Sequence, residues 1–524
     1  MNVYEFINLS ADVFPDREAL VFENRRYDYQ SLRESIVRLA GGLQRLGVGP
    51  GQRVAALDTN TDRYIQLFYA TAFLGATFVP LNYRARNDEL LHFLTTAEVG
   101  VLGVGAQYRN QALSLRSAVS SVRHLVSLDE GGEAMVSFED LLEEGAELEP
   151  AEVDDEDICV IMFTAGTTAK PKGVMLRFGD FSNYVMNTAD PVAEDDHFAQ
   201  LLVAPFYHIA GLTSIMLSPY SARRMVVLRQ FETIRWLETV QKERVTHAFL
   251  VPTMLKRLVD EPAFPQYDLS SLEIVSYGAA PMPPGVILRA IDLFPKTVGF
   301  INAYGQTETT STVTMLGPED HRLEGSPEEV ERKKARLRSI GRPLPDVELR
   351  IVDEQHQTLP AGVVGELAIR ADRIMKGYLS QEGKLVDAAK RDDEGWVYTS
   401  DLGWMDEEGY VFLAGRRSDM IIRGGENISP EEVETVLYRH PAVEDVAVVG
   451  LPDEEWGERV VAVVVPRRDA PGVVGEGELI AFCRERLASF KKPSRVVFVD
   501  ELPRSPLGKV LKAKLREQLA SAGY

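Results

Sequence analysis

Cysteine is nearly absent from this chain: among 524 residues, only Cys159 and Cys483 carry a thiol. Two cysteines this far apart are too few for a disulfide framework or a paired-cysteine metal site, and they favour a reducing, cytoplasmic compartment. Cys159 falls in an apolar strand pattern and Cys483 on an apolar helix face, so we expect both side chains in the core.

Basic residues are also fewer than acidic ones. Lysine and arginine number 57 against 79 aspartates and glutamates, which gives a formal net charge of −22. Nucleic-acid binding through phosphate contacts needs a concentrated basic surface, and this balance argues against such a partner. We find no apolar run of roughly 18 residues and no signal-like N-terminus, so we expect neither a membrane span nor secretion. Apolar residues at 45% and charged residues at 26% are typical of a globular protein.

What is present is the rhythm of a layered α/β protein. From Asp28 to about Val104, helix-length periodic segments alternate with short β-type runs, which is the pattern of βαβ units. The acidic stretch over residues 129–157 indicates a solvated connection with one amphipathic piece. After it the alternation resumes, and ICVIMF, LLVA, RMVVL, HAFLV, EIVSY and GFINA predict further strands.

Two different textures follow. From about Ser339, strand-turn-strand patterns without helices predict a small antiparallel, barrel-like sheet. From Ser418 onward, about 100 residues carry their own helix and strand patterns, enough for a separate α+β domain. The predicted fold class is α/β, with an N-terminal domain over residues 1–417 that includes the β-barrel-like subdomain and a small α+β C-terminal domain over residues 418–524.

The most informative segment is FTAGTTAKPKGV, directly after the strand ICVIMF. Its hydroxyls, backbone amides and two lysines suit a polyphosphate, because successive N–H groups form an anion-binding concavity. It is not a Walker A sequence, since Pro171 stands where that motif has glycine, and the chain has no GxGxxG. A plain polar turn between two strands is the alternative. The candidate phosphate-binding residues are Thr164, Gly166, Thr167, Thr168 and Lys172.

This loop resembles the phosphate loop of the adenylate-forming (ANL) superfamily, which includes acyl-CoA synthetases, luciferases and peptide-synthetase adenylation domains. The family's other motifs occur in order as YGAAPM, AYGQTETT, YTSDLGW, GRRSDMIIRGGENISPEEVE and PRSPLGKVLK, so the similarity covers nearly the whole chain. The resemblance implies an AMP-forming carboxylate–CoA ligase. Such an enzyme converts a carboxylate and ATP to acyl-AMP and pyrophosphate, then forms an acyl-CoA thioester and releases AMP.

The resemblance also implies the catalytic set. Lys509 matches the lysine that bridges the carboxylate and the α-phosphate, and it suits this role as a mobile point charge. Thr307 matches a phosphate-contacting hydroxyl, and Glu308 matches the carboxylate that binds Mg²⁺, a cation that prefers oxygen ligands. A threonine cap at a helix start is compatible with these roles. The implied cofactors are therefore ATP, Mg²⁺ and coenzyme A as co-substrate.

The nucleoside site follows in the same way. Tyr304 matches the ring that stacks on adenine, Asp401 the acid that accepts both ribose hydroxyls, and Arg416 the arginine of the ribose and phosphate. A carboxylate suits the two hydroxyls because both of its oxygens accept hydrogen bonds. The adenine edge would meet the backbone of Gly278, Ala279, Ala280 and Pro281.

For the second half-reaction, the resemblance implies a mobile C-terminal domain that swings about a hinge at Ser418 and brings Gly425 to the pantetheine tunnel. Three residues depart from the family's usual pattern. Ser418 replaces the usual aspartate or lysine, and Ala165 and Ala169 stand where serine and glycine are commoner. These departures leave the rate of the swing and the affinity for ATP open.

The acyl pocket is assigned to Tyr207, His208 and Ile209 in PFYHIAGL, together with Tyr277. The segment has no aspartate to pair an ammonium group, which disfavours amino acids. Gly305 replaces the tryptophan with which acetyl-CoA synthetases close the pocket, so we expect an acid larger than acetate. Medium- or long-chain fatty acids and aryl or alicyclic acids both stay open. His208 is read either as a packed histidine or as a positional gate, without acid-base catalysis.

Three alternatives stay open at this point. The first is an acyl-AMP ligase that loads a carrier-protein thiol, which the RGGENISP segment disfavours. The second is a luciferase-like oxygenase that shares the same loops. The third is a non-catalytic binding protein, against which the four charged residues Lys509, Glu308, Asp401 and Arg416 argue. Assembly into a homodimer is neither predicted nor excluded.

Overall fold

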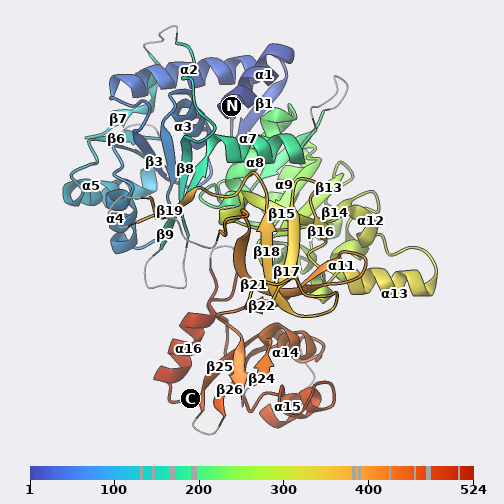
Figure 1. The fold of residues 1–524 in the computed structure, drawn as a ribbon. Helices are drawn as coiled ribbons and strands as arrows, with labels where there is room; N and C mark the ends of the chain where they lie inside the picture. The colour runs from blue at the N-terminus through green and yellow to red at the C-terminus, as the bar shows by residue number, and fades with distance from the viewer. Residues whose placement is uncertain are drawn as a thin grey trace.

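The computed structural model describes residues 1–129, 134–143, 148–164, 171–190, 197–380, 385–386, 391–423, 426–453, 456–467, 474–505 and 508–524. Over these residues the chain forms four β-sheets with covering helices. Figure 1 shows three sheets and their helices in one large body, with the fourth sheet in a smaller body below it. No helix in the described ranges is both long and apolar enough to cross a membrane.

The first sheet has the order β20-β19-β9-β8-β4-β3-β5-β6-β7. Its strands are β3 Arg53–Leu57, β4 Thr77–Pro80, β5 Val101–Val104, β6 His124–Ser127, β7 Val136–Ser137, β8 Ile158–Thr164, β9 Lys172–Arg177, β19 Gly377–Leu379 and β20 Leu385–Val386. The helices of this region are α2 Tyr29–Arg45, α3 Asp62–Phe73, α4 Asn87–Thr96, α5 Arg109–Ala118, α6 Phe138–Leu142 and α7 Phe178–Thr188.

The second sheet has the order β16-β15-β14-β13-β12-β10-β11-β1-β2. Its strands are β1 Glu18–Phe22, β2 Arg25–Asp28, β10 Ala199–Leu202, β11 Arg224–Val227, β12 His247–Leu250, β13 Ile274–Gly278, β14 Gly299–Gln306, β15 Ser311–Leu316 and β16 Arg342–Pro343. Its helices are α1 Glu5–Val13, α8 Ile209–Tyr220, α9 Thr233–Glu243, α10 Pro252–Val259, α11 Pro284–Leu293, α12 Pro318–His321 and α13 Pro327–Arg336.

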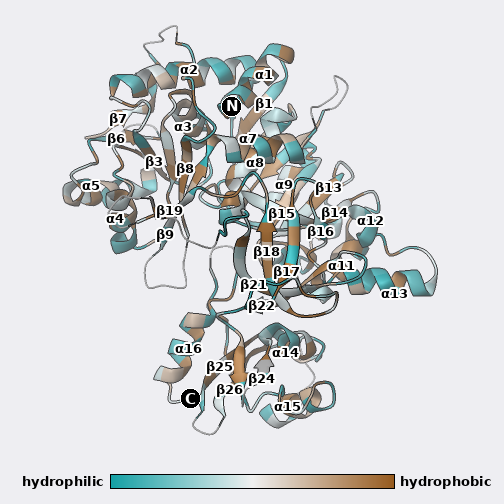
Figure 2. Cartoon of the chain, in the orientation of Figure 1, coloured by the Kyte–Doolittle hydropathy of each residue, from teal (hydrophilic) through white to brown (hydrophobic). Residues whose placement is uncertain are grey.

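The core lies between these two sheets. The central strands of both sheets are parallel, and β3, β4 and β5 of the first sheet are almost wholly buried, which is why these three read as short apolar runs rather than alternating ones. Helix α3 is buried at every position, and one apolar cluster contains side chains from strands of both sheets. Figure 2 shows the apolar strands inside and polar residues on the outer helices. The predicted α/β class is confirmed, and Cys159 is buried.

The third sheet is antiparallel, with the order β17-β18-β21-β22, as the texture after Ser339 predicts. Its strands are β17 Glu348–Val352, β18 Gly365–Arg370, β21 Val397–Met405 and β22 Val411–Arg416. The fourth sheet comprises β23 Ile421–Arg423, β24 Glu426–Ile428, β25 Val443–Asp453, β26 Gly457–Pro466 and β27 Arg495–Phe498. Helices α14 Pro430–Leu437, α15 Glu476–Arg484 and α16 Lys512–Ser521 complete this α+β unit, in which Cys483 is buried.

Candidate active site

Asp401 is the centre of the best-connected part of the site. Strands β21 and β22 pair so that Asp401 lies opposite Arg416, and the Nε atom of Arg416 is 3.0 Å from Oδ1 of Asp401. The Tyr304 hydroxyl and the Gln306 amide both donate to Oδ2, each at 2.6 Å. Asp401 is only 6% exposed, so this set of donors compensates a buried charge. Burial, followed by the charge of Asp401, raises the pKa of Tyr304 well above its usual range.

Glu308 forms the second part of the site, in a short 3₁₀ turn, Thr307–Thr309, that follows β14. The Thr309 hydroxyl caps this turn, because it accepts a hydrogen bond from the backbone N–H of Gln306 at 3.0 Å. The Tyr378 hydroxyl donates to Oε1 of Glu308 at 2.8 Å. Thr307 and Glu308 therefore lie beside the Asp401 network, because Gln306 belongs to both.

The donor chemistry of this turn suits Mg²⁺ bound together with a substrate phosphate. A carboxylate and a neighbouring hydroxyl are hard oxygen donors, and Mg²⁺ is usually bound by one or two carboxylates plus phosphates and water. The described residues contain no group of three or more acidic, histidine or cysteine side chains that would form a complete metal cage. A single carboxylate at Glu308 is consistent with Mg²⁺ that is bound mainly by phosphates and water.

The candidate phosphate loop connects two antiparallel strands. Thr164 ends β8, Lys172 begins β9, and the two residues are register partners. The Lys172 ammonium lies 5.1 Å from the centroid of the Tyr378 ring, so the strand after the loop approaches the Glu308 turn. Gly166, Thr167 and Thr168, together with Ala165 and Ala169, lie outside the described residues.

Lys509 lies in a tight loop before α16, within electrostatic reach of Asp401 and Arg416. Burial, followed by the charge of Arg416, lowers the pKa of Lys509 below its ordinary value, while Asp401 opposes this shift. The preceding Gly508 packs on α10: a Cβ atom at 508 would lie 2.6 Å from Cγ2 of Thr253. The loop of Lys509 therefore lies near Asp401 and Arg416, the residues predicted to form the nucleoside site.

The chain segment between the two bodies runs through a turn after β22. Ser418 is exposed, and its carbonyl accepts a long hydrogen bond of 3.4 Å from Arg516 of α16. The same guanidinium pairs with Asp419 at 2.7 Å. Gly425, which the sequence assigns to the thiol tunnel, lies outside the described residues.

Two predicted glycine positions are constrained by backbone packing. Gly278 ends β13, and a Cβ atom there would collide with the carbonyl of Ala303 on β14. Ala279 follows with φ +66, and Ala280 and Pro281 continue the same turn before α11. A Cβ atom at Gly305 would collide with the carbonyl of Ser311, so the close approach of β15 already requires glycine. The role of Gly305 in setting pocket volume stays a prediction.

The segment assigned to the acyl pocket precedes α8. Tyr207 and His208 lie ring against ring at 4.3 Å, Tyr83 packs on Tyr207 at 5.1 Å, and Ile209 begins the helix. The Tyr207 hydroxyl and Nε2 of His208 are buried and have no hydrogen-bond partner among the described residues. Burial and the charge of Arg84 lower the pKa of His208 to about 3, so its imidazole is neutral at physiological pH.

The structure does not bring Tyr277 to this cluster. Its side chain has no exposed surface, and its hydroxyl bonds Nε2 of His321 at 2.8 Å inside the apolar cluster of the second sheet. The polar end of Tyr277 is thus used inside the core, and its role in the acyl pocket stays a prediction that this position does not favour. Sequence reasoning also missed Gln306 and Tyr378, since neither carries a charge that would single it out.

Comparisons with known proteins agree with this geometry. The family model described as AMP-binding enzyme matches residues 8–379, and the model for the AMP-binding enzyme C-terminal domain matches residues 432–509. An indoleacetate–CoA ligase from Aromatoleum aromaticum is 34% identical, covering 99% of this chain and 98% of that protein. A feruloyl-CoA synthase from Amycolatopsis is 34% identical over 94% and 93%. The structure of an amide bond synthetase from Marinactinospora thermotolerans has a TM-score of 0.86 at 31% identity over 98% and 99%.

Proposed function

Because this chain belongs to the AMP-binding enzyme family, we propose that it joins an aromatic carboxylic acid to coenzyme A. The chain is an ATP-dependent carboxylate–CoA ligase of the adenylate-forming superfamily. In the first half-reaction a carboxylate oxygen attacks the α-phosphate of ATP, which gives acyl-AMP and pyrophosphate. In the second, the thiol of CoA attacks the acyl carbon, releases AMP and loses its proton to give the thioester.

One observation carries the assignment of the first half-reaction: the loop of Lys509 packs on α10, and its ammonium lies within electrostatic reach of Asp401 and Arg416. The attack joins two anions, so positive charge at the α-phosphate must supply much of the rate enhancement. Lys509 would hold the attacking carboxylate against the α-phosphate. Its burial strengthens that interaction, because water screens it less.

The nucleoside is proposed to lie along the Asp401 network. Both oxygens of Asp401 would accept ribose hydroxyls, with Arg416 beside them and the ring of Tyr304 against adenine. The backbone of residues 278–281 would meet the adenine edge, and Thr164, Lys172 and the intervening loop would contact the phosphates. Glu308 and Thr307 would hold Mg²⁺, which when bound neutralises phosphate charge.

For the second half-reaction we propose that residues 418–524 form a mobile domain on the body of residues 1–417. The exposed turn at Ser418 would be the hinge, and rotation there would withdraw Lys509 so that the thiol enters past Gly425. The 3.4 Å pair of Lys256 and Glu444 across this boundary joins two partly exposed side chains, and a pair of this kind is weak enough to break.

Aromatic acids are favoured by two observations. Two of the relatives that cover nearly the whole chain are named as an indoleacetate–CoA ligase and a feruloyl-CoA synthase. The segment before α8 presents Tyr207 and His208 against Tyr83, and stacked or edge-on aromatic contacts suit an aryl substrate. The absence of an acidic residue in PFYHIAGL agrees with a substrate that lacks an ammonium group.

The test is a panel of acids scored first by pyrophosphate release and then by thioester formation. Indoleacetate, ferulate and 2-succinylbenzoate would be compared with octanoate, palmitate, acetate and phenylalanine. We expect kcat/KM for the best aryl acid to exceed that for every aliphatic acid by at least about tenfold. Preference for octanoate or palmitate would contradict the aryl assignment.

A second arm of the experiment identifies the acceptor. CoA, a phosphopantetheinylated carrier protein, a simple amine and no acceptor would be compared after acyl-AMP has formed. We expect the thioester with CoA to dominate. Dominant amide formation would instead match the named activity of the amide bond synthetase that shares this fold.

A further inference from the structure

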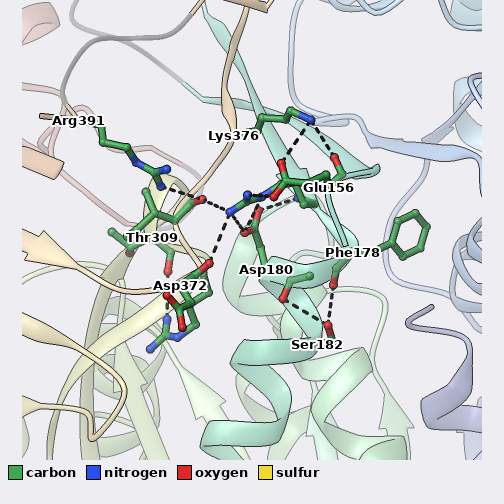
Figure 3. Close-up of polar contacts among 12 residues, drawn as sticks. Glu156, Phe178, Asp180, Ser182, Thr309, Asp372, Lys376 and Arg391 are labelled. Atoms are coloured by element: carbon green, nitrogen blue, oxygen red, sulfur yellow. Dashed lines mark hydrogen bonds and ion pairs between the residues drawn. The ribbon is translucent and has the colours of Figure 1, made fainter. Parts of the chain in front are cut away.

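Residues 372–378 form a linking segment that packs between the phosphate-loop strand and the Glu308 turn. On one side, the Lys376 amide bonds the Met175 carbonyl of β9 at 2.9 Å, and Tyr378 pairs with Val174 where β19 meets β9. The Lys376 ammonium donates to the Glu156 carbonyl at 3.0 Å. Figure 3 shows Thr309 at the left and Lys376 extending toward Glu156 at the upper right. The segment is therefore firmly attached to β9.

The other side of the linking segment holds the 3₁₀ turn. The Met375 amide donates to the Glu308 carbonyl at 2.9 Å. The guanidinium of Arg373 donates to the carbonyls of Thr309 and Thr310 at 3.1 and 3.5 Å. Arg373 has no exposed surface and is paired with Asp346 at 2.6 Å, so its position is fixed.

The hydrogen bonds from Arg373 and Met375 stabilise a turn that ends in an unfavourable backbone conformation. Thr310 and Ser311 have φ values of +47 and +76, which non-glycine residues, and β-branched ones above all, rarely adopt. Such conformations persist where surrounding contacts over-determine them, often at functional sites. Met375 bonds the carbonyl of Glu308 and Arg373 bonds those of Thr309 and Thr310, and these bonds thereby fix the backbone from which the Glu308 side chain projects.

Within the described part of the chain, one hydrogen bond holds the side chain of Glu308, and it comes from the Tyr378 hydroxyl. Among the described residues, the hydrogen bonds of this carboxylate involve only Oε1, which leaves Oε2 for another ligand. The Tyr378 ring also lies under the Lys172 ammonium at 5.1 Å, so one tyrosine joins a cation of β9 to the carboxylate. A hydrogen bond to an ionised acceptor is short, directional and about twice as strong as a neutral one.

We propose that Tyr378 is a positioning residue that holds the Glu308 carboxylate in the orientation required to bind a magnesium–nucleotide complex. The proposal rests on the proposed function, because it assumes that Glu308 receives Mg²⁺ with ATP. Tyr378 acts through Glu308 and touches neither the acyl group nor the α-phosphate. Its removal therefore affects magnesium-dependent nucleotide binding and spares binding that needs no metal.

The test compares wild type with Tyr378→Phe, which removes the hydroxyl and keeps the ring beside Lys172. Calorimetric titrations measure the affinity for ATP with Mg²⁺, for ATP with EDTA, and for AMP with EDTA. We expect the variant to bind ATP with Mg²⁺ about tenfold more weakly and to need about tenfold more Mg²⁺ for half-maximal pyrophosphate release. Affinities measured in EDTA should stay at the wild-type value.

Tyr410→Phe is the matched control. It also removes a tyrosine hydroxyl from a carboxylate, since Tyr410 donates to Oδ1 of Asp320 at 2.9 Å outside the site. We expect this variant to keep the wild-type magnesium dependence, whatever its thermal stability. An equal magnesium shift in both tyrosine variants would overturn the proposal, because it would indicate a general loss of rigidity.

A double mutant tests whether Tyr378 acts through Glu308. In Glu308→Gln the benefit of Mg²⁺ to ATP binding should be lost, and adding Tyr378→Phe should then change nothing further. Additive losses would overturn the proposal, as would a Tyr378→Phe enzyme with wild-type magnesium dependence. Failure of the proposed function is recognised separately, because wild type itself would then release no pyrophosphate and bind ATP equally with Mg²⁺ or EDTA.

Discussion

At the residue scale, the replacement of Asp401 is the substitution for which the site geometry predicts the clearest loss of nucleotide affinity. One oxygen of the Asp401 carboxylate forms an ion pair with Arg416, and the other accepts hydrogen bonds from Tyr304 and Gln306. An asparagine there must turn its NH₂ group toward one set of donors, so at least one charge-assisted bond becomes a clash of donors. Loss of hydrogen bonding to a charged group should weaken AMP and ATP binding about 10- to 100-fold in Asp401→Asn, measured by calorimetry.

The matched control is Asp392→Asn. Asp392 is another structural carboxylate of the third-sheet region, which accepts from the Tyr398 hydroxyl at 2.7 Å and from neighbouring backbone amides. This substitution should lower the melting temperature without changing nucleotide affinity. Nucleotide binding by Asp401→Asn at the wild-type affinity would contradict the ribose assignment.

The sequence predicts which charged residues belong to the site, but it does not predict the contacts of uncharged side chains. Ordered motifs predicted that Glu308, Asp401, Arg416 and Lys509 serve one site, and in the fold they are linked through Gln306 and through electrostatic contact. The direction in which an uncharged ring points depends on three-dimensional packing, which no motif encodes. Tyr277 therefore turned out to bond His321 in the core, while Tyr378, outside every motif, bonds Glu308.

At the scale of elements, the loop before α16 carries a prediction of its own. Gly508 has φ +78, and a side chain there would meet Thr253 of α10. Gly508→Ala should therefore hold Lys509 away from the site and slow pyrophosphate release about 100-fold or more, the usual cost of one lost electrostatic contact at a reacting centre. Thioester formation from supplied acyl-AMP should be preserved, because that step does not need the docked lysine.

Backbone strain and collision can be separated at this loop. Gly409→Ala imposes a comparable strain, since Gly409 has φ +84, but nothing lies within 4 Å of its Cβ position. This variant should lose stability and keep both half-reactions. Adding Thr253→Ala to Gly508→Ala should restore part of the adenylation rate, because the two closest atoms of Thr253 are then gone. No rescue, with equal loss of both half-reactions, would contradict the docking role of this loop.

Elements themselves were largely predictable, and their pairing was not. Apolar runs of four or five residues between periodic segments identified the central strands correctly, and for β3 and β4 the reason is that these parallel strands are buried on both faces. The run ICVIMF gave no sign that β8 would join the first sheet and turn back antiparallel to β9. Strand order depends on contacts between residues far apart in sequence, such as β1 beside β11, which local periodicity does not contain.

At the scale of the whole molecule, the decisive question is whether the two bodies separate during turnover. Lys256 on α10 and Glu444 on β25 approach to 3.4 Å across the boundary, and both side chains are partly exposed. In a Lys256→Cys/Glu444→Cys enzyme, a short bis-methanethiosulfonate reagent would join the bodies in the arrangement that docks Lys509. The native thiols are buried and should not react.

If the C-terminal body must swing, the cross-linked enzyme should release pyrophosphate in a single turnover at nearly the normal rate and accumulate bound acyl-AMP. Thioester formation should stop, because the docked lysine loop then blocks the approach of the thiol. A reductant that cleaves the cross-link should restore the thioester, which separates the effect of tethering from damage by the reagent. Thioester formation at the same rate before and after reduction would mean that one arrangement serves both half-reactions, and the hinge at Ser418 would then have no role in catalysis.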